Sequence, residues 1–576
     1  MVEADLYLPN ECWESIFKFL NDDNHLYLEP LSLVSKHFLS ITNRLQSSLT
    51  INTITPFSYS AHPFLHSLFK RFSNLTSLDL TPFKGDLNEL LYEISCFRLK
   101  LTSLKLSDQR IIPTHGLRTF SEKITTLTSL TCSNIVYIGD NDLVLISQCF
   151  PYLQQLDLST NNTRLPKNFM VNIMFMALPM LRKVDLSSLS YIDDSSFLNL
   201  CKGCVFLEEV IIKTYLFLSQ DGIASAIRER PTLRSLSITW NWRTWNWESN
   251  GIQENFSSQC IDSLVTLKEL ACLDLSTWRI SDELLSSIAM GGLPLRKLVL
   301  IRCTGHSYAG IFSLLSKCRC IQHLNLRLTQ FLNDQHVVQL SPYLSDLLSI
   351  NLSNCKMLTE STLFALVRNC PSLREIKMSS TSIGKNIVED SDSLMDFGVY
   401  PQLKSLDLAF SSCLRDENIN TFALIFPNLQ FLDLSSCNGI SEEGIGQVLR
   451  RCCKIRHLNL SGLKSLRMDF KVSTLEVLNL SRSGIDDISL YFISKSCSGL
   501  LQLDLERCFD VSEIGVRLVL ENCTRLRELN LQGCGNVSIV AVHSMVYIRP
   551  SLRMITGRFV HQCCVRHCEL CRSDML

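Results

Sequence analysis

The sequence predicts an α/β fold, a solenoid of about 19 strand–loop–helix repeats that follows a small module of helices. The pattern Leu-x-x-Leu-x-Leu, or a close variant, recurs nineteen times, mostly at intervals of 26 residues. Each unit of such a repeat buries its apolar face only against its neighbours, so the units stack. We therefore expect a curved horseshoe of leucine-rich repeats, whose function is binding. Clear cases of the pattern occupy residues 75–80, 153–158, 403–408, 429–434 and 526–531.

Each unit is expected to contain one short strand and one helix. The last two leucines of the pattern alternate with polar residues, which is typical of a strand with one buried face. Farther along the unit, Ser281 and Ser512 each precede apolar residues that share one helical face. Because a serine hydroxyl can accept a hydrogen bond from a free amide at a helix start, these serines are predicted helix caps.

The residue midway between the last two leucines is expected to project from the concave side of the sheet. Twelve of the eighteen residues in this row are Asp or Asn. The row is either an acidic binding surface or a set of groups that serves the repeat itself, and the fixed spacing favours the second interpretation. Four residues that depart from the rule are then candidates for partner contacts, namely Lys105, Ile211, Val299 and Lys377.

Many of the 25 cysteines occupy two fixed positions of the repeat. Such recurrence predicts small buried side chains with a weak donor, and not disulfides. One set lies eight residues after the first leucine of its repeat, and consists of Cys303, Cys355, Cys437, Cys508 and Cys534. The other set lies three residues before that leucine, and consists of Cys204, Cys318, Cys370, Cys452, Cys497 and Cys523.

Charge and targeting signals suggest a protein of the cytoplasm and/or nucleus. Lys and Arg number 55 against 56 Asp and Glu, and no basic tract stands out, so we expect no nucleic-acid partner. The first ten residues lack the features of a signal peptide. No apolar run reaches the roughly 18 residues of a membrane span, and we expect no membrane association.

The 26-residue period fails in three places, and insertions in solenoids often lie on the binding face. The intervals are 37 residues from Leu233, 30 residues from Leu373 and 20 residues from Ile455. The longest one contains four of the six tryptophans. Exposed aromatic residues are frequent binding hot spots, yet a loop that packs its own rings on the solenoid is an equal alternative. These tryptophans are Trp240, Trp242, Trp245 and Trp247.

The C-terminal tail, residues 561–576, is rich in cysteine. Cys564, His567, Cys568 and Cys571 include a Cys-x-x-Cys pair, which suits zinc. A second well-formed pair is missing, so a capping or unstructured tail is favoured. We expect no metal and no cofactor.

The first 45 residues do not follow the repeat. A first helix opens around Pro9, and its apolar residues fall on one face. Asn21–Asn24 ends it, and apolar residues from Leu31 to Leu45, at intervals of three and four, predict a second amphipathic helix. About 45 residues bury too little surface to be stable alone, so this module needs a partner or must dock on the solenoid.

Two motifs in this module resemble an F-box. They are Leu-Pro-x-Glu-x-x-x-x-Ile-Phe-x-x-Leu at residues 8–20 and Leu-Ser-Leu-Val-Ser-Lys-x-Phe at residues 31–38. Ser35 replaces the usual Cys, and Phe38 replaces the usual Trp. Together with the cysteine-containing repeats, the whole chain resembles plant F-box/leucine-rich-repeat proteins.

That resemblance implies a substrate receptor of a Skp–cullin–F-box (SCF) ubiquitin ligase. The F-box would bind a Skp-type adaptor, and through it the cullin–RING ligase, while the repeats bind a protein destined for proteasomal degradation. Implied domains are an F-box (1–48), a linker and N-terminal cap (49–72), the solenoid (73–560) and the tail. Carried over by position, the residues that form or support the adaptor contact are Leu8, Pro9, Ile16, Phe17, Leu20, Leu33 and Val34.

Two other functions are compatible with the repeats. A hormone-type small-molecule co-receptor shares the architecture, but the concave row supplies only two lysines, Lys105 and Lys377, for an inositol phosphate. A ligase-independent scaffold or inhibitor is the other alternative. No phosphate-binding glycine loop, His-Glu-x-x-His or Gly-x-Ser-x-Gly motif is present, and we expect no enzyme activity of the chain itself.

Overall fold

The structure is a computed structural model, in which the chain divides into two compact units, Met1–Leu236 and Ser237–Leu576. Among the described helices, none combines the length and the apolar character that a bilayer crossing requires. The described residues are 8–22, 28–51, 61–160, 178–189, 192–215, 218–240, 256–385, 398–463, 472–549, 552–557 and 560–564.

The first unit begins with a helical module of three helices, α1 (Asn10–Asp22), α2 (Leu28–Ser32) and α3 (Lys36–Leu45). Phe17, Leu28 and Ile41 form its buried core. The rings of Trp13 and Phe17 pack on Phe38 at centroid distances of 4.7 and 5.0 Å. The core of the module is therefore small and largely aromatic.

The prediction of one continuous second helix is wrong, because the chain breaks between α2 and α3. Ser35 adopts an extended conformation, and its hydroxyl accepts a hydrogen bond from the Phe38 amide at 3.1 Å. A serine that caps a helix start stabilises that break. The intervals of three and four continue across it, although Val34 lies outside both helices and is exposed.

The module is tied to the repeats by a strand and by side-chain hydrogen bonds. β1 (Ser48–Thr50) follows α3 and pairs in parallel with β2 (Ser77–Asp79). Arg71 Nε donates to Asn43 Oδ1 at 2.9 Å, and Asn74 Nδ2 donates to the Arg44 carbonyl at 3.0 Å. The C-terminal end of α3 is thus the part of the module that contacts the solenoid.

Repeats of strand, turn and helix then fill the rest of the first unit. Strands β1 to β7 pair in parallel, each with the next along the chain. The further strands are β3 (Ser103–Lys105), β4 (Ser129–Thr131), β5 (Gln155–Asp157), β6 (Lys183–Asp185), β7 (Glu209–Tyr215) and β8 (Ser235–Trp240), which crosses the unit boundary. The helices are α4 (Ala61–Arg71), α5 (Leu87–Ser95), α6 (Thr114–Lys123), α7 (Asp140–Cys149), α9 (Asp194–Gly203) and α10 (Gln220–Arg228).

The second unit continues the same pattern. Its strands are β9 (Cys272–Asp274), β10 (Lys297–Val299), β11 (His323–Asn325), β12 (Ser349–Asn351), β13 (Glu375–Lys377), β14 (Ser405–Asp407), β15 (Phe431–Asp433), β16 (His457–Asn459), β17 (Val477–Asn479), β18 (Gln502–Asp504), β19 (Glu528–Asn530), β20 (Met554–Gly557) and β21 (Val560–Cys564). Its helices are α11 (Ser258–Val265), α12 (Asp282–Gly291), α13 (Tyr308–Lys317), α14 (Asp334–Leu340), α15 (Glu360–Asn369), α16 (Asp416–Ile425), α17 (Glu442–Arg451), α18 (Asp487–Ser496), α19 (Glu513–Asn522) and α20 (Ile539–Ile548).

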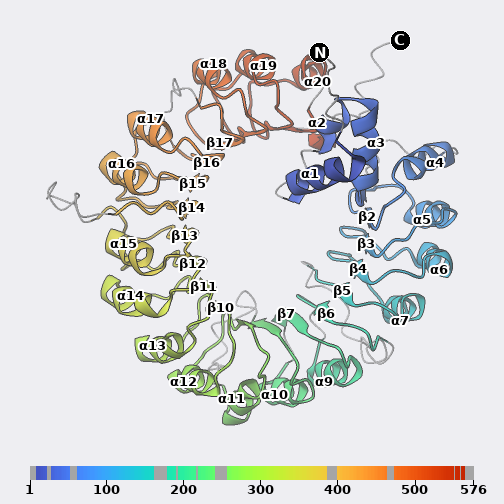
Figure 1. Ribbon diagram of the computed structural model, residues 1–576, viewed down its shortest axis with the longest axis vertical. Helices are drawn as coiled ribbons and strands as arrows, with labels where there is room; N and C mark the ends of the chain where they lie inside the picture. Colours follow the sequence, from blue (N-terminus) through green and yellow to red (C-terminus); the bar gives the residue numbers. More distant parts are fainter. Residues whose placement is uncertain are drawn as a thin grey trace, which may run out of the picture. The chain divides into compact units, whose positions relative to one another are not determined.

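The predicted leucine-rich-repeat solenoid is confirmed. The eighteen residues of the predicted row fall one each in the described strands β2 to β19. The strands of the second unit pair in parallel from β9 to β20, with equivalent repeat positions opposite one another, as Leu298 is to Leu324. Within each unit the strands succeed one another on one side of the repeats and the helices on the other (Figure 1).

The twelve Asp and Asn residues of the concave row stabilise the repeat itself, as the fixed spacing predicted. In every case a side-chain oxygen accepts a hydrogen bond from the amide two residues later, which shapes the turn after the strand. In many repeats the residue three positions after the Asp or Asn has a positive φ. Examples are Leu328, at 68°, and Gly462, at 75°. The twelve are Asp79, Asp157, Asp185, Asp274, Asn325, Asn351, Asp407, Asp433, Asn459, Asn479, Asp504 and Asn530.

The predicted cysteine role is also confirmed for the described residues. The Sγ atoms of Cys303 and Cys534 lie 3.1 and 3.0 Å from carbonyl oxygens of the preceding repeat, at Leu275 and Leu505. Burial raises the pKa of Cys303 to about 12 and that of Cys534 to about 11. These thiols stay protonated at neutral pH. The described cysteines are free thiols.

The predicted caps Ser281 and Ser512 accept hydrogen bonds from amides in the first turns of α12 and α19. In several units the capping Ser or Thr also joins two repeats. Its amide and hydroxyl both donate to a carboxylate at the start of the preceding helix, an arrangement that we call the carboxylate staple. The pairs are Asp194–Ser219, Asp282–Ser307, Asp334–Thr359, Asp416–Ser441, Asp487–Ser512 and Glu513–Ser538.

Glycines make room for some of these staples. Gly444, in the first turn of α17, lies so close to Asp416 that an added Cβ would stand 2.2 Å from its Oδ1 atom. Gly515 is similarly close to Asp487, at 2.4 Å. A side chain at either position would displace the carboxylate. The staple can therefore form only because the residue there is glycine.

Candidate functional site

The helical module exposes several large apolar side chains. Leu33 is 82% exposed and Val34 is 66% exposed, in the turn between α2 and α3. On α1, Ile16, Phe19 and Leu20 are exposed by 40, 76 and 40%, and their spacing places them on one face of that helix. We call these five residues, with Leu8, the module surface.

Six of the seven residues predicted to contact an adaptor are exposed, namely Leu8, Pro9, Ile16, Leu20, Leu33 and Val34. Phe17, the seventh, is only 1% exposed and belongs to the core of the module. The single apolar face predicted for α1 is thus divided: Trp13 and Phe17 pack inward, whereas Ile16 and Leu20 do not. Phe19 was missed, although its helical spacing from Ile16 pointed to it.

The module surface is large for a segment of this size. Complete burial of one such side chain is worth about 1.5–3 kcal/mol, and contiguous exposed apolar patches usually mark interaction sites. The contacts of the module with the solenoid come from the end of α3 and leave the module surface uncovered by described residues. A protein partner that covers it would gain considerable free energy.

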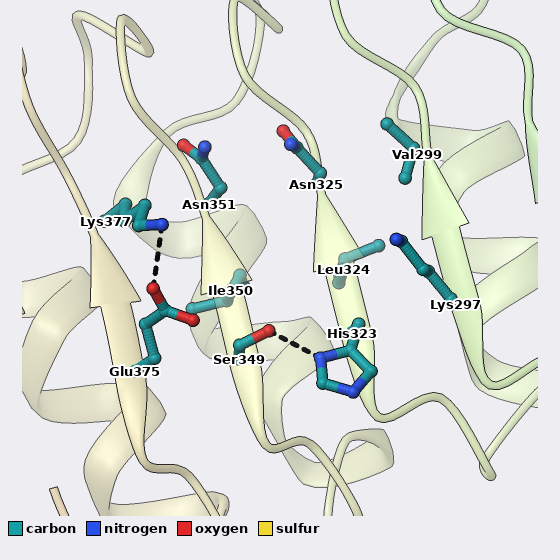
Figure 2. Close-up of a pocket in the computed structure, with 10 residues that line it drawn as sticks. All are labelled: Lys297, Val299, His323, Leu324, Asn325, Ser349, Ile350, Asn351, Glu375 and Lys377. Atoms are coloured by element: carbon teal, nitrogen blue, oxygen red, sulfur yellow. Dashed lines mark hydrogen bonds and ion pairs between the residues drawn. The ribbon is translucent and has the colours of Figure 1, made fainter. Parts of the chain in front are cut away.

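A second candidate site lies on the strand side of the second unit, over β10 to β13. It is a pocket of about 330 Å³. Leu324 and Ile350 lie between two charged sides, with Lys297 on one and Glu375 and Lys377 on the other (Figure 2). The complete lining is Lys297, Val299, His323, Leu324, Asn325, Ser349, Ile350, Asn351, Glu375 and Lys377.

Two interactions fix polar groups of this pocket. Lys377 Nζ lies 2.8 Å from Glu375 Oε1, and His323 Nδ1 lies 2.7 Å from Ser349 Oγ. Both join residues of the lining, and both are drawn in Figure 2. Two of the four predicted partner-contact residues, Val299 and Lys377, line this pocket on its two outermost strands, and Val299 is buried.

The other two do not line this pocket. Lys105, at the end of β3, is exposed, and Ile211, in β7, is half-buried, and both belong to the first unit. The predicted tryptophan site lies outside the described residues, because Trp242, Trp245, Trp247 and the side chain of Trp240 fall there. These assignments stay predictions.

The candidate zinc ligands also lie outside the described residues, apart from the backbone of Cys564 at the end of β21. The described part of the chain contains no group of three or more His, Cys, Asp or Glu residues arranged to hold a metal ion.

Repeated parallel strands, turn-forming Asp and Asn residues and buried cysteines define a leucine-rich-repeat protein. No protein-family model matches the chain. The chain is 24% identical over 187 residues to the BTB/POZ domain-containing protein FBL11 of Arabidopsis thaliana. That match covers 30% of this chain and 18% of the relative, so it spans under a fifth of the length of that protein.

The solved structures that match this chain share few residues with it. A chain in the crystal structure of the yeast Rad7 and Elc1 complex is 17% identical, with a TM-score of 0.44, over 76% of this chain and 95% of that one. A chain of the TLR13–ssRNA13 complex is 16% identical, with a TM-score of 0.43, over 88% and 76% of the two chains. None of these similarities assigns a function.

Proposed function

We propose that this chain is the substrate-recognition subunit of an SCF-type ubiquitin ligase complex. The module surface would bind a Skp-type adaptor, and the repeats would bind the protein to be ubiquitinated. The observation that carries the proposal is the exposure of Leu33 and Val34 on a module whose core is otherwise closed. The F-box motifs that contain these residues support the same assignment.

Such a receptor acts by holding two proteins together and needs no catalytic residue of its own. Tethering a target close to the conjugating enzyme raises its effective concentration, so that transfer becomes nearly intramolecular. The stacked repeats suit this role, because neighbouring units satisfy one another's polar groups through the carboxylate staples. The holder would be rigid on the scale of a bound peptide.

Co-expression with a Skp-type adaptor, followed by size-exclusion chromatography, tests the proposal. We expect the full chain to elute in a complex with the adaptor. Replacing Ile16 and Leu20 with aspartate should abolish the complex, whereas Ile488→Asp, at an exposed apolar residue of α18, should preserve it.

Failure of the full chain to bind an adaptor would contradict the ligase role and would favour a ligase-independent scaffold or inhibitor. A complex that survives aspartate at both Ile16 and Leu20 would contradict the assigned surface. The hormone-type alternative predicts instead that the receptor holds its protein partner only when a small molecule is added.

A further inference from the structure

The pocket over β10 to β13 lies where the carboxylates of the concave row are interrupted. The row carries Asp274 on β9 and Asp407 on β14, but Val299, Asn325 and Asn351 on β10, β11 and β12. Elsewhere in the second unit, Asp or Asn at this position mainly shapes a turn. On β11 and β12 the residues that shape the turn are the neutral Asn325 and Asn351. They keep the turn of the repeat without adding a negative charge.

The polar groups that remain available in the pocket are mostly donors. Asn325 Oδ1 accepts from the Arg327 amide at 3.1 Å, and Asn351 Oδ1 accepts from the Ser353 amide at 3.0 Å. Because only the oxygen of an amide can accept these bonds, the Nδ2 groups are the free ends. The two side chains lie next to each other at one end of the pocket (Figure 2).

The charge of the lining is positive. Glu375 is its one carboxylate, and Lys377 already pairs with it. Lys297, on the opposite side, forms no ion pair with any described residue. Arg327, just beyond Asn325, is also exposed and pairs with no described carboxylate. An incoming carboxylate would therefore find a free ammonium group and two amide donors.

The pocket has the dimensions of a short stretch of extended chain. Four parallel strands at about 4.8 Å spacing span roughly 14 Å, the length of four or five extended residues. His323 and Ser349 lie in register between Lys297 and Glu375, whereas Leu324 and Ile350 are each only 3% exposed and belong to the core of the repeats. An occupant that suits Lys297 and the neutral polar groups beside it carries an acidic side chain.

We propose that this pocket binds an extended segment of the partner protein, with an Asp or Glu side chain directed to Lys297. That the segment belongs to a ubiquitination substrate rests on the function proposed above. The acidic preference itself rests on the lining and on the interruption of the carboxylate row.

Selection of random displayed peptides on the purified full chain tests the inference. We expect the enriched peptides to share an acidic residue. For one such synthetic peptide, fluorescence anisotropy should show a loss of about tenfold or more when its acidic residue becomes the neutral amide, as expected for a close charge pair. Added salt should weaken the wild-type complex more than that of the amide peptide.

Variants of the pocket then locate the contact. Lys297→Glu should weaken the acidic peptide by about tenfold or more, and a peptide with Lys in place of the acid should recover binding to that variant. Glu375→Gln removes the one carboxylate of the lining and should tighten binding about threefold. Lys454→Glu, at an exposed lysine outside the pocket, is the matched control and should have little effect.

Several outcomes overturn the inference. They are no enriched peptide, enrichment without an acidic residue, and equal affinity for wild type and Lys297→Glu. Displacement of the peptide by inositol hexakisphosphate at a lower concentration than by the acidic peptide would instead identify a small-anion site. If Lys297→Glu misfolds, Lys297→Gln replaces it, after its melting temperature has been checked.

Adaptor binding by the same preparations separates the two proposals. A chain that binds acidic peptides through Lys297 but no adaptor contradicts the ligase role and leaves the acidic preference standing. A chain that binds the adaptor but shows no acidic preference contradicts this inference alone.

Discussion

The helical module and the repeats bury their apolar side chains to different extents. In the repeats, the leucines of the strands are buried almost completely, as Leu298 and Leu324 are, because each unit covers the next. In the module, a core around Phe17 is closed, while Leu33 and Val34 remain exposed. Each repeat covers the leucines of its neighbour, whereas the module leaves Leu33 and Val34 uncovered by described residues. We infer from this difference that the module is a part of the chain that binds a partner.

The largest expected effect comes from the module surface. Replacing Leu33 and Val34 with aspartate should weaken adaptor binding more than about 100-fold, because hot-spot residues at a buried interface each contribute about 2 kcal/mol or more. Both side chains are exposed in the free chain, so the melting temperature should hardly change. Isothermal titration calorimetry measures the affinity. Ile514→Asp, at an exposed residue of α19, is the control that should bind normally.

Substitution of Phe17, in the same module, should lower stability, in contrast to substitution of Leu33 and Val34. Phe17→Ala should cost about 3–5 kcal/mol through the cavity that it leaves. Since the core of the module is small, we expect the module to unfold locally while the repeats stay folded. Limited proteolysis should then cut the variant before β1 and spare the rest. Equal protection in Phe17→Ala and wild type would show that Phe17 is not a core residue.

The carboxylate staples are expected to have a smaller effect on the repeats. Asp487→Ala leaves the amide and hydroxyl of Ser512 without their acceptor and should cost about 1–3 kcal/mol. Urea unfolding of this variant measures the cost. Asp510→Ala, at an exposed residue in the next turn, should change stability by less than about 0.5 kcal/mol. Similar values for both variants would argue against the staple.

One staple should depend on pH. Burial raises the pKa of Asp282, but hydrogen bonds from the hydroxyl and amide of Ser307 outweigh it and lower the pKa below its ordinary value of 3.8. A depressed carboxyl pKa stabilises the fold above the unfolded pKa, and this stability is lost as the pH falls through the folded pKa. Asp282→Asn should therefore lower the melting temperature at neutral pH and change it much less near pH 3. A difference that is independent of pH would contradict the charged staple.

The smallest effect concerns thiol reactivity. Burial raises the pKa of Cys355 to about 11 and that of Cys437 to about 12, so neither thiol should react with iodoacetamide at neutral pH until urea unfolds the chain. The exposed Cys320 and Cys453 should be labelled in the folded protein. Mass spectrometry of the labelled peptides distinguishes the two groups. Prompt labelling of Cys355 or Cys437 would show that the repeats open readily.

The repeats could be predicted well because their signals are local and recur. The strand positions, the caps at Ser281 and Ser512 and the turn-forming Asp and Asn residues each follow from a few neighbouring side chains repeated along the chain. The break before α3 was missed because apolar intervals of three and four run across it. The cap at Ser35 decides the conformation there.

The candidate sites were less accessible to sequence reasoning. Val299 and Lys377 stood out because they break a row, yet Lys297 occupies a different position of the repeat and drew no notice. The pocket combines side chains from four strands that are 26 residues apart or more. Its sequence signal is that no residue of the concave row between Asp274 and Asp407 is an Asp. This signal becomes meaningful only once the row is known to face the same side of the sheet.

Hydrogen–deuterium exchange of the full chain, with and without a Skp-type adaptor, tests the central contrast most directly. We expect the adaptor to slow exchange in residues 8–20 and 31–36 and to leave the strands β9 to β20 unchanged. Slower exchange in those strands, with none in the module, would contradict the proposal that the module, and not the repeats, binds the adaptor.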